Sequence, residues 1–356
     1  MTCSSNNPAK APRPMKERVA SIDFARGYAI FTIVCYHALQ RAGLPLLWQK
    51  AIVFGGTGVH LFFLLSGFGL GLSGDRIQAG AFYRRRLVKV WLPYVLALTI
   101  SLLAATFFQL FPDGFDAWLA GAGLYQMFSE RYIESFGGHF WFVSAIMQFY
   151  IAFPALLWLK SKLGNRRFLL TALGLSIGWW LLVYFAGKSH LRVWNSFFLQ
   201  FLWEFALGMM LAGRYKQGKL NPSPLRKRWW LSLPAGLLFT GIMVCMVLKM
   251  GDAGKVFNDI PALAGYGALC YFVHESGRHF FPFVVRFFLW LSGFSYSLYL
   301  VHVLVLEAYL RWLQQYGIAA SAGFLLPFLA LTILAGRIFE PISRRWSGLF
   351  EPKRPA

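Results

Sequence analysis

Long apolar runs alternate with short polar segments along most of the chain. Ten runs of about 18 to 22 residues contain few charges, close to the roughly 20 apolar residues that a helix needs to cross a bilayer. The pattern therefore predicts an all-α, polytopic integral membrane protein of about ten transmembrane helices. The predicted spans are residues 22–39, 54–72, 91–111, 139–159, 168–187, 195–213, 229–248, 256–274, 287–306 and 320–339.

The basic residues support this order of spans. If the N-terminus is cytoplasmic, 26 of the 35 Lys and Arg residues fall in segments on that side, and only eight fall on the opposite side. Such an excess is typical of cytoplasmic loops, so both termini are predicted to be cytoplasmic. Residues 1–17 are expected to form a disordered tail, residues 18–345 one membrane domain, and residues 346–356 a second cytoplasmic tail.

The composition argues against two other classes of protein. Hydrophobic residues make up 57% of the chain and charged residues 14%, whereas soluble domains carry about 25% charged residues. The net charge of +21 would suggest nucleic acid on a soluble chain, but neither a basic surface helix nor an RNA-type aromatic motif accompanies it. Nucleic acid is therefore not predicted as a partner. The four cysteines lack CxxC spacing, which argues against a disulfide framework or a zinc site, so no metal is predicted either.

Three ionisable residues interrupt the first span. Asp23, Arg26 and His37 lie in IDFARGYAIFTIVCYHAL, and eleven residues of helix place Arg26 and His37 on one face, about 16 Å apart in depth. Ionisable groups in a membrane helix are costly and usually face a protein interior or a water-filled cavity. We therefore predict that these residues form a functional site. An ion pair of Asp23 with Arg26 near the membrane interface is the simpler alternative.

A dense basic cluster precedes the third span. Arg84, Arg85, Arg86 and Lys89 lie on the predicted cytoplasmic side, where basic residues are common for topological reasons alone. Arginine also binds phosphate oxygens through paired hydrogen bonds, so the cluster is a candidate site for a phosphorylated ligand. Neither a Walker motif nor a GxGxxG motif after a strand accompanies it.

Polar residues in later spans are further candidates. Glu204 lies in a uniformly apolar run, where a carboxylate must be protonated or meet a cation. Ser295, Tyr299 and His302 recur at i, i+4 and i+7, which places them on one stripe of a helix. Such a stripe in a membrane helix faces protein or water, and hydrogen bonding between helices alone would explain it.

Several of these motifs together resemble those of a known family. The first span carries Arg and His separated by ten residues, and a late span carries SYSLYLVH. Both are similar to motifs of the membrane-bound acyltransferase 3 family, and the resemblance extends from about residue 18 to residue 345. The matching segments are residues 18–27 with His37, 58–68, 85–94, 139–154 and 295–302.

This resemblance implies an O-acyltransferase in the inner (plasma) membrane of a bacterium. The donor would be cytoplasmic acetyl-CoA, the acceptor a hydroxyl of a carbohydrate or lipid-linked glycan of the envelope, and membrane lipids would surround the protein without any metal cofactor. Catalysis would involve His37 with Arg26 and Asp23, while the basic cluster would bind the donor. The residues expected to line the substrate cavity are Ser66, Trp141, Glu204, Tyr299 and His302.

A transporter of a lipid-linked saccharide or organic acid is the main alternative. Arg26, Glu204 and His302 would then be substrate or proton sites, although no internal repeat supports this class. A non-catalytic partner of a glycan assembly complex is a third candidate. The sequence leaves open the sugar and its hydroxyl, the acyl length, the oligomeric state, and whether His37 acts as a general base or carries the acyl group.

Overall fold

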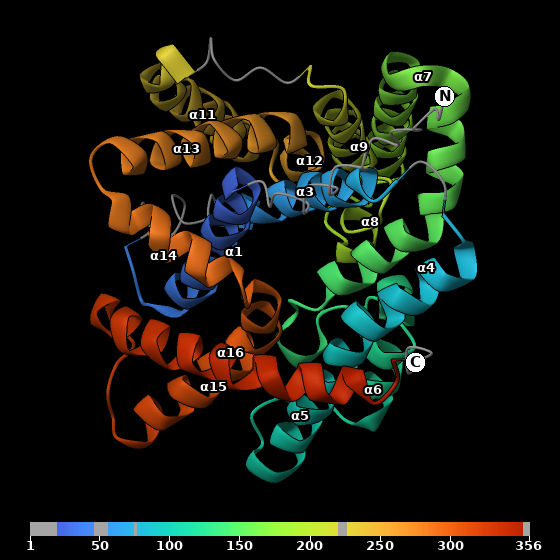
Figure 1. The fold of residues 1–356 in the computed structure, drawn as a ribbon. Helices are drawn as coiled ribbons and strands as arrows, with labels where there is room; N and C mark the ends of the chain where they lie inside the picture. Colours follow the sequence, from blue (N-terminus) through green and yellow to red (C-terminus); the bar gives the residue numbers. More distant parts are fainter. Residues whose placement is uncertain (1–19, 46–55, 75–76, 220–225, 352–356) are drawn as a thin grey trace, which may run out of the picture.

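The computed structural model describes residues 20–45, 56–74, 77–219 and 226–351, and within these ranges the chain forms helices and no strand (Figure 1). The elements are α1 (Ala20–Arg41), α3 (Gly58–Leu72), α4 (Ala79–Arg86), η2 (Leu87–Trp91), α5 (Leu92–Phe108), α6 (Phe115–Ala122), η3 (Tyr125–Phe128), η4 (Ser135–Gly137), α7 (Trp141–Phe185), α8 (Arg192–Asn195), α9 (Leu202–Lys216), η5 (Trp229–Leu231), α11 (Ser232–Met250), α12 (Asp252–Phe257), α13 (Asp259–His279), α14 (Pro282–Ser292), α15 (Ser295–Gln315), η6 (Ala322–Phe324) and α16 (Leu325–Gly348).

Four helical segments of the described chain are long and apolar enough to cross a membrane, and the bent pair α14 and α15 makes a fifth if it is counted as one span. The four are Ala79–Phe108, Trp141–Phe185, Trp229–Met250 and Leu325–Gly348. The predicted all-α class is therefore confirmed, and the segments are those of a membrane protein. The number of ten spans and the cytoplasmic termini stay predictions. The expected tail of residues 1–17 lies outside the described residues.

The predicted span 287–306 is not one straight helix. α14 and α15 meet at 84° around Gly293. Sharp kinks in helices often occur at Gly/Ser pairs, and Ser292 precedes this glycine. The Ser292 hydroxyl donates to the Leu289 carbonyl at 2.7 Å, and the Ser295 hydroxyl donates to the Ser292 carbonyl at 3.1 Å. These bonds satisfy carbonyl groups that a continuous helix would have paired with backbone N–H groups.

Two other predicted spans, 139–159 and 168–187, belong to the long helix α7. Gly164 interrupts it with φ 72° and ψ 170°, a backbone conformation that glycine adopts far more readily than other residues. The chain therefore changes direction at Gly164 and continues as a second helical arm.

The helices α3 and α9 cross with their backbones in contact. A Cβ atom added to Gly67 would lie 2.0 Å from the carbonyl oxygen of Phe205, and one added to Gly208 would lie 2.0 Å from that of Leu64. Small residues at a crossing let membrane helices approach closely, which strengthens dispersion contacts between them. The crossing fixes the relative position of two helices that each carry a buried ionisable residue.

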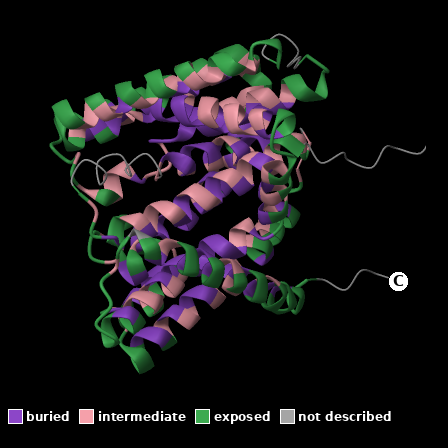
Figure 2. Ribbon diagram, turned by 90° about the vertical axis from the view of Figure 1, so that its left-hand side faces the viewer, coloured by how far each residue is buried: buried purple, intermediate pink, exposed green. Residues whose placement is uncertain are grey.

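Buried residues gather between the helices, and exposed residues lie on the outer faces (Figure 2). The exposed positions include large apolar side chains such as Phe107, Phe185 and Leu326, which are 73%, 79% and 77% exposed. Apolar surface of this kind is rare on soluble monomers and suits contact with lipid.

We expect Gly208→Leu to lower the thermal stability of the protein sharply, because the new side chain would overlap a backbone carbonyl that cannot rotate away. Overpacking of a tight core typically costs about 1–3 kcal/mol. Thermal denaturation in detergent, followed by size-exclusion chromatography, measures the change. Gly174→Ala is the control, since Gly174 is an exposed position of α7 where a Cβ atom meets nothing within 4 Å. Equal stability of the two variants would contradict the close crossing.

Candidate functional site

A cavity of about 570 Å³ opens beside His37, and we call it the His37 cavity. Residues from α1, α3, α8 and α15 line it, together with the end of the loop before α7 and the starts of α7 and α13. Three of its basic residues, Arg41 at the end of α1, Arg192 on α8 and Lys255 on α12, lie in segments that the charge pattern assigns to the same side of the membrane. The cavity therefore groups residues as the predicted topology does.

Three histidines form a row at the wall of this cavity. The ring centroids of His37 and His302 are 5.1 Å apart, and those of His302 and His139 are 4.9 Å apart. His302 and His139 are almost completely buried, whereas His37 is half-buried and lines the cavity. His37 is thus the member of the row that a ligand in the cavity can reach.

Hydrogen bonds to α15 hold the two buried histidines, and His139 Nε2 lies 3.5 Å from the Leu300 carbonyl oxygen. His302 Nδ1 lies 2.6 Å from the Tyr299 carbonyl oxygen, so this nitrogen carries the hydrogen and donates it. The Tyr299 hydroxyl in turn donates to the carbonyl of His139. Within the described chain, His302 Nε2 has no hydrogen-bond partner, so its lone pair is available as an acceptor beside His37.

The rest of the wall combines aromatic and charged groups. The guanidinium carbon of Arg192 lies 4.9 Å from the ring centroid of Trp141, a cation–π geometry. Arg41 and Glu307 form an ion pair at 2.5 Å. These groups offer flat apolar rings and hydrogen-bonding partners in one cavity, a combination that suits ring-shaped polar ligands.

Glu204 faces the protein interior and not the lipid. Its Oε1 lies 2.7 Å from His60 Nδ1, and its side chain is completely buried. His60 lines the His37 cavity, so Glu204 lies directly behind the cavity wall. The sequence predicts that this carboxylate must meet a proton or a cation. In the structure, the imidazole of His60 is the group that it meets.

The structure separates Arg26 from His37. Arg26 Nη1 lies 3.4 Å from Asp23 Oδ1, and the Arg26 side chain is 39% exposed. Neither Arg26 nor Asp23 lines the His37 cavity. The ion pair that the sequence offered as the simpler alternative is present, and it lies three helical turns from the histidine.

The predicted donor cluster forms an exposed basic surface on α4 and η2. Arg84, Arg85 and Lys89 are exposed, while the guanidinium of Arg86 lies 5.3 Å from the ring centroid of Tyr150.

Lys89 lines a second cavity of about 540 Å³, which we call the Lys89 cavity. The first turn of α15 lines it too, including Tyr296 and Ser297. The Ser297 hydroxyl donates to Glu340, whose other oxygen accepts from Arg344 at 2.5 Å. Helix α15 thus has its first turn at the Lys89 cavity and residues further along at the His37 cavity.

The remaining candidates have mixed outcomes. Trp141 lines the His37 cavity, whereas Tyr299 and His302 are buried behind it, with His302 in contact with His37, and do not line it. Ser66 is half-buried on α3, beside the crossing with α9, and does not line this cavity. Sequence reasoning missed Arg192, which lies on the short helix α8 outside the predicted spans, and Asp259, although an acidic residue within a predicted span carries the same signal as Glu204.

A family model described as an acyltransferase domain matches residues 19–337 of the chain. No curated protein and no solved structure matches it.

We expect diethyl pyrocarbonate to modify His37 before His139 and His302, because only the His37 ring borders the cavity. Peptide mass spectrometry after short exposures in detergent gives the order of reaction. The exposed His190 should react first and calibrates the reagent. Modification of His302 as fast as His37 would contradict the arrangement of the row.

Proposed function

The chain belongs to the acyltransferase family whose model covers residues 19–337, and from this premise we propose that it transfers an acetyl group from cytoplasmic acetyl-CoA to a hydroxyl of an envelope or exported glycan. Acyl transfer is the chemistry of the family; the donor, the acceptor and the bacterial inner membrane are our proposal. The observation that carries it is the position of His37 at the wall of a large polar cavity, with one helix connecting that wall to a second cavity beside the basic cluster.

The donor binds at the Lys89 cavity. Coenzyme A is rich in phosphate. The planar guanidinium groups of the exposed Arg84 and Arg85 and the compact ammonium group of Lys89 both bind phosphate oxygens. Arg26, paired with Asp23 near the start of α1, adds a further cation on the same predicted side of the membrane. In this proposal Arg26 and Asp23 serve donor binding rather than proton transfer.

The thioester reaches His37 along α15. Ser297 lines the Lys89 cavity, and His302 contacts His37 five residues later, a rise of about 7.5 Å along a helix. This distance is short compared with a transmembrane helix, so a flexible arm that enters from one cavity can present its acyl group at the wall of the other.

The acceptor occupies the His37 cavity. Its volume of about 570 Å³ lies within the roughly 300–1,000 Å³ typical of small-molecule sites. Tyr36 offers a ring face for a sugar. Arg192, which lies over the Trp141 ring, offers hydrogen bonds to hydroxyl groups together with Glu134 and Glu307. A glycan therefore fits the lining better than an apolar ligand does.

His37 acts as the general base. Its imidazole takes the proton of the acceptor hydroxyl as the oxygen attacks the thioester carbonyl, the new C–O bond forms, the C–S bond breaks, and the proton passes to the departing sulfur. Transient acetylation of His37 is the alternative route, and it would leave a labelled enzyme in the absence of acceptor.

His37→Ala is expected to reduce acetyl transfer about 10²- to 10⁴-fold, the usual contribution of a general base, while donor binding is retained. Purified protein is incubated with labelled acetyl-CoA and candidate glycans, and label in the glycan is measured. His190→Ala, an exposed histidine, is the control. Undiminished transfer by His37→Ala would refute its role, whereas saccharide movement without consumption of acetyl-CoA would favour the transporter.

Combined replacement of Arg84, Arg85 and Lys89 by Ala is expected to weaken acetyl-CoA binding at least tenfold, because several charge-assisted contacts to phosphate are lost. Equilibrium binding of labelled acetyl-CoA measures the effect. Arg166→Ala with Arg167→Ala removes two other exposed cations of the same predicted side and should leave binding unchanged. If the two variants bind acetyl-CoA equally well, the basic cluster does not bind the donor, and its charges reflect only the membrane topology.

A further inference from the structure

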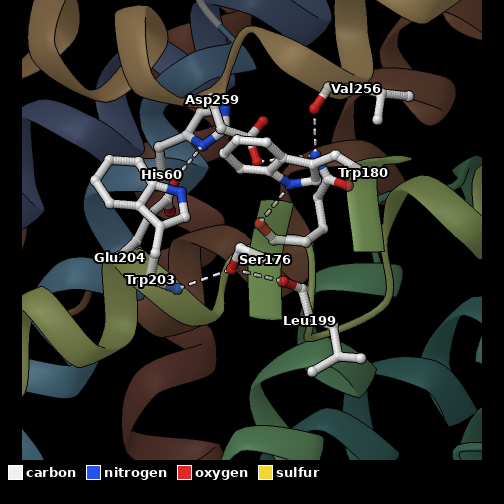
Figure 3. Close-up of polar contacts among 9 residues, drawn as sticks. His60, Ser176, Trp180, Leu199, Trp203, Glu204, Val256 and Asp259 are labelled. Atoms are coloured by element: carbon white, nitrogen blue, oxygen red, sulfur yellow. Dashed lines mark hydrogen bonds and ion pairs between the residues drawn. The ribbon is translucent and has the colours of Figure 1, made fainter. Parts of the chain in front are cut away.

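A second cluster of ionisable groups adjoins the His37 cavity and takes no part in the transfer proposed above. It consists of His60 on α3, Glu204 on α9 and Asp259 at the first turn of α13. One nitrogen or carboxylate oxygen of each residue lies within 4.8 Å of the others, and all three residues are buried (Figure 3). His60 and Asp259 line the cavity, so the cluster can be reached from it.

The hydrogen bonds within the cluster leave one carboxylate oxygen without a partner. His60 Nδ1 and Glu204 Oε1 are 2.7 Å apart, and Gln200 Nε2 donates to Asp259 Oδ2 at 2.9 Å. Within the described chain, Glu204 Oε2 has no hydrogen-bond partner, although the residue is completely buried. A buried, unpartnered oxygen is costly, so this position favours a further electropositive group.

The charges point to a divalent ion. Neither carboxylate of the cluster forms an ion pair with a Lys or Arg of the described chain; the only ion pair is between Glu204 and His60. A protonated His60 would supply one positive charge against two carboxylates. A divalent cation neutralises both carboxylates and leaves the imidazole neutral, which removes the cost of burying uncompensated charge in a membrane domain.

The donor atoms indicate which cation. One imidazole nitrogen with two carboxylates is a mixed set that suits Zn²⁺ or a neighbouring first-row ion, whereas Ca²⁺ and Mg²⁺ favour oxygen donors alone. The ligand atoms of the three residues now lie within 4.8 Å of one another. Metal–ligand bonds of about 2.0–2.2 Å would require these atoms to come closer together, which side-chain rotation can achieve. Gln200 would orient Asp259 from outside the ligand set.

We propose that His60, Glu204 and Asp259 form a binding site for a divalent transition-metal ion, with Zn²⁺ as the representative ion. The ion would join α3, α9 and α13 at one wall of the His37 cavity. It would displace the proton that His60 and Glu204 share, so binding should release protons.

Metal analysis of the full-length protein tests this site without any measurement of acyl transfer. Protein in detergent is stripped with a chelator, incubated with Zn²⁺, desalted and analysed by mass spectrometry of the metal. We expect about one equivalent of Zn²⁺ in the wild type and its loss in Glu204→Gln and Asp259→Asn, which keep the shape of each side chain. Glu307→Gln, which removes a carboxylate from the same cavity but not from the cluster, should retain the ion.

Two results would overturn the site. One is a wild-type protein that retains neither Zn²⁺ nor Mn²⁺ after this treatment, which would mean that protons alone neutralise the cluster. The other is retention of the ion by Glu204→Gln. If the amide variants do not remain monodisperse on size-exclusion chromatography, the wild-type protein is loaded with Co²⁺ instead. We expect the visible absorption bands of a site with nitrogen and oxygen ligands. The absence of these bands would refute the proposal.

Discussion

The cost of burying charge and hydrogen-bonding groups away from water governs this structure. The exposed apolar side chains of the described residues suit contact with lipid. Each ionisable group within a helix therefore needs a polar partner or a cavity. Glu204 meets His60, Asp23 meets Arg26, and His302 bonds to a backbone carbonyl of its own helix. The polar interior is therefore a set of paired groups, and one of these pairs, His60 with Glu204, lies at the wall of the His37 cavity.

Helix α15 borders both cavities of this interior. The 84° bend at Gly293 turns α15 away from the axis of α14. The first turn of α15 after the bend borders the Lys89 cavity. Further along, the same helix supports the histidine row and the wall of the His37 cavity. Had the chain continued straight through residues 287–306, as the hydropathy pattern predicts, α15 would have followed the course of α14.

The apolar runs predict the helical class and the position of most helices, because local hydrophobicity determines which segments leave water. They do not predict the bend at Gly293 or the proximity of His60 to Glu204, which are 144 residues apart. Helical spacing correctly put Arg26 and His37 on the same helix, but it carries no information on which groups of other helices each one meets. Asp259 was missed although its place in a predicted span carries the same signal as Glu204.

The separation of Arg26 from His37 changes what the first helix does. A single cavity shared by both residues would bring donor phosphates and the acceptor hydroxyl to one place, on one side of the membrane. Their distance along α1 instead assigns the cation to one end and the imidazole to the other. In the proposed reaction, only the acyl group then has to pass between the two cavities, while the charged parts of the proposed donor and the polar acceptor remain where water can solvate them. Because moving either charged partner through the apolar domain would cost far more than moving an acetyl thioester, this arrangement is the one that the burial constraint favours.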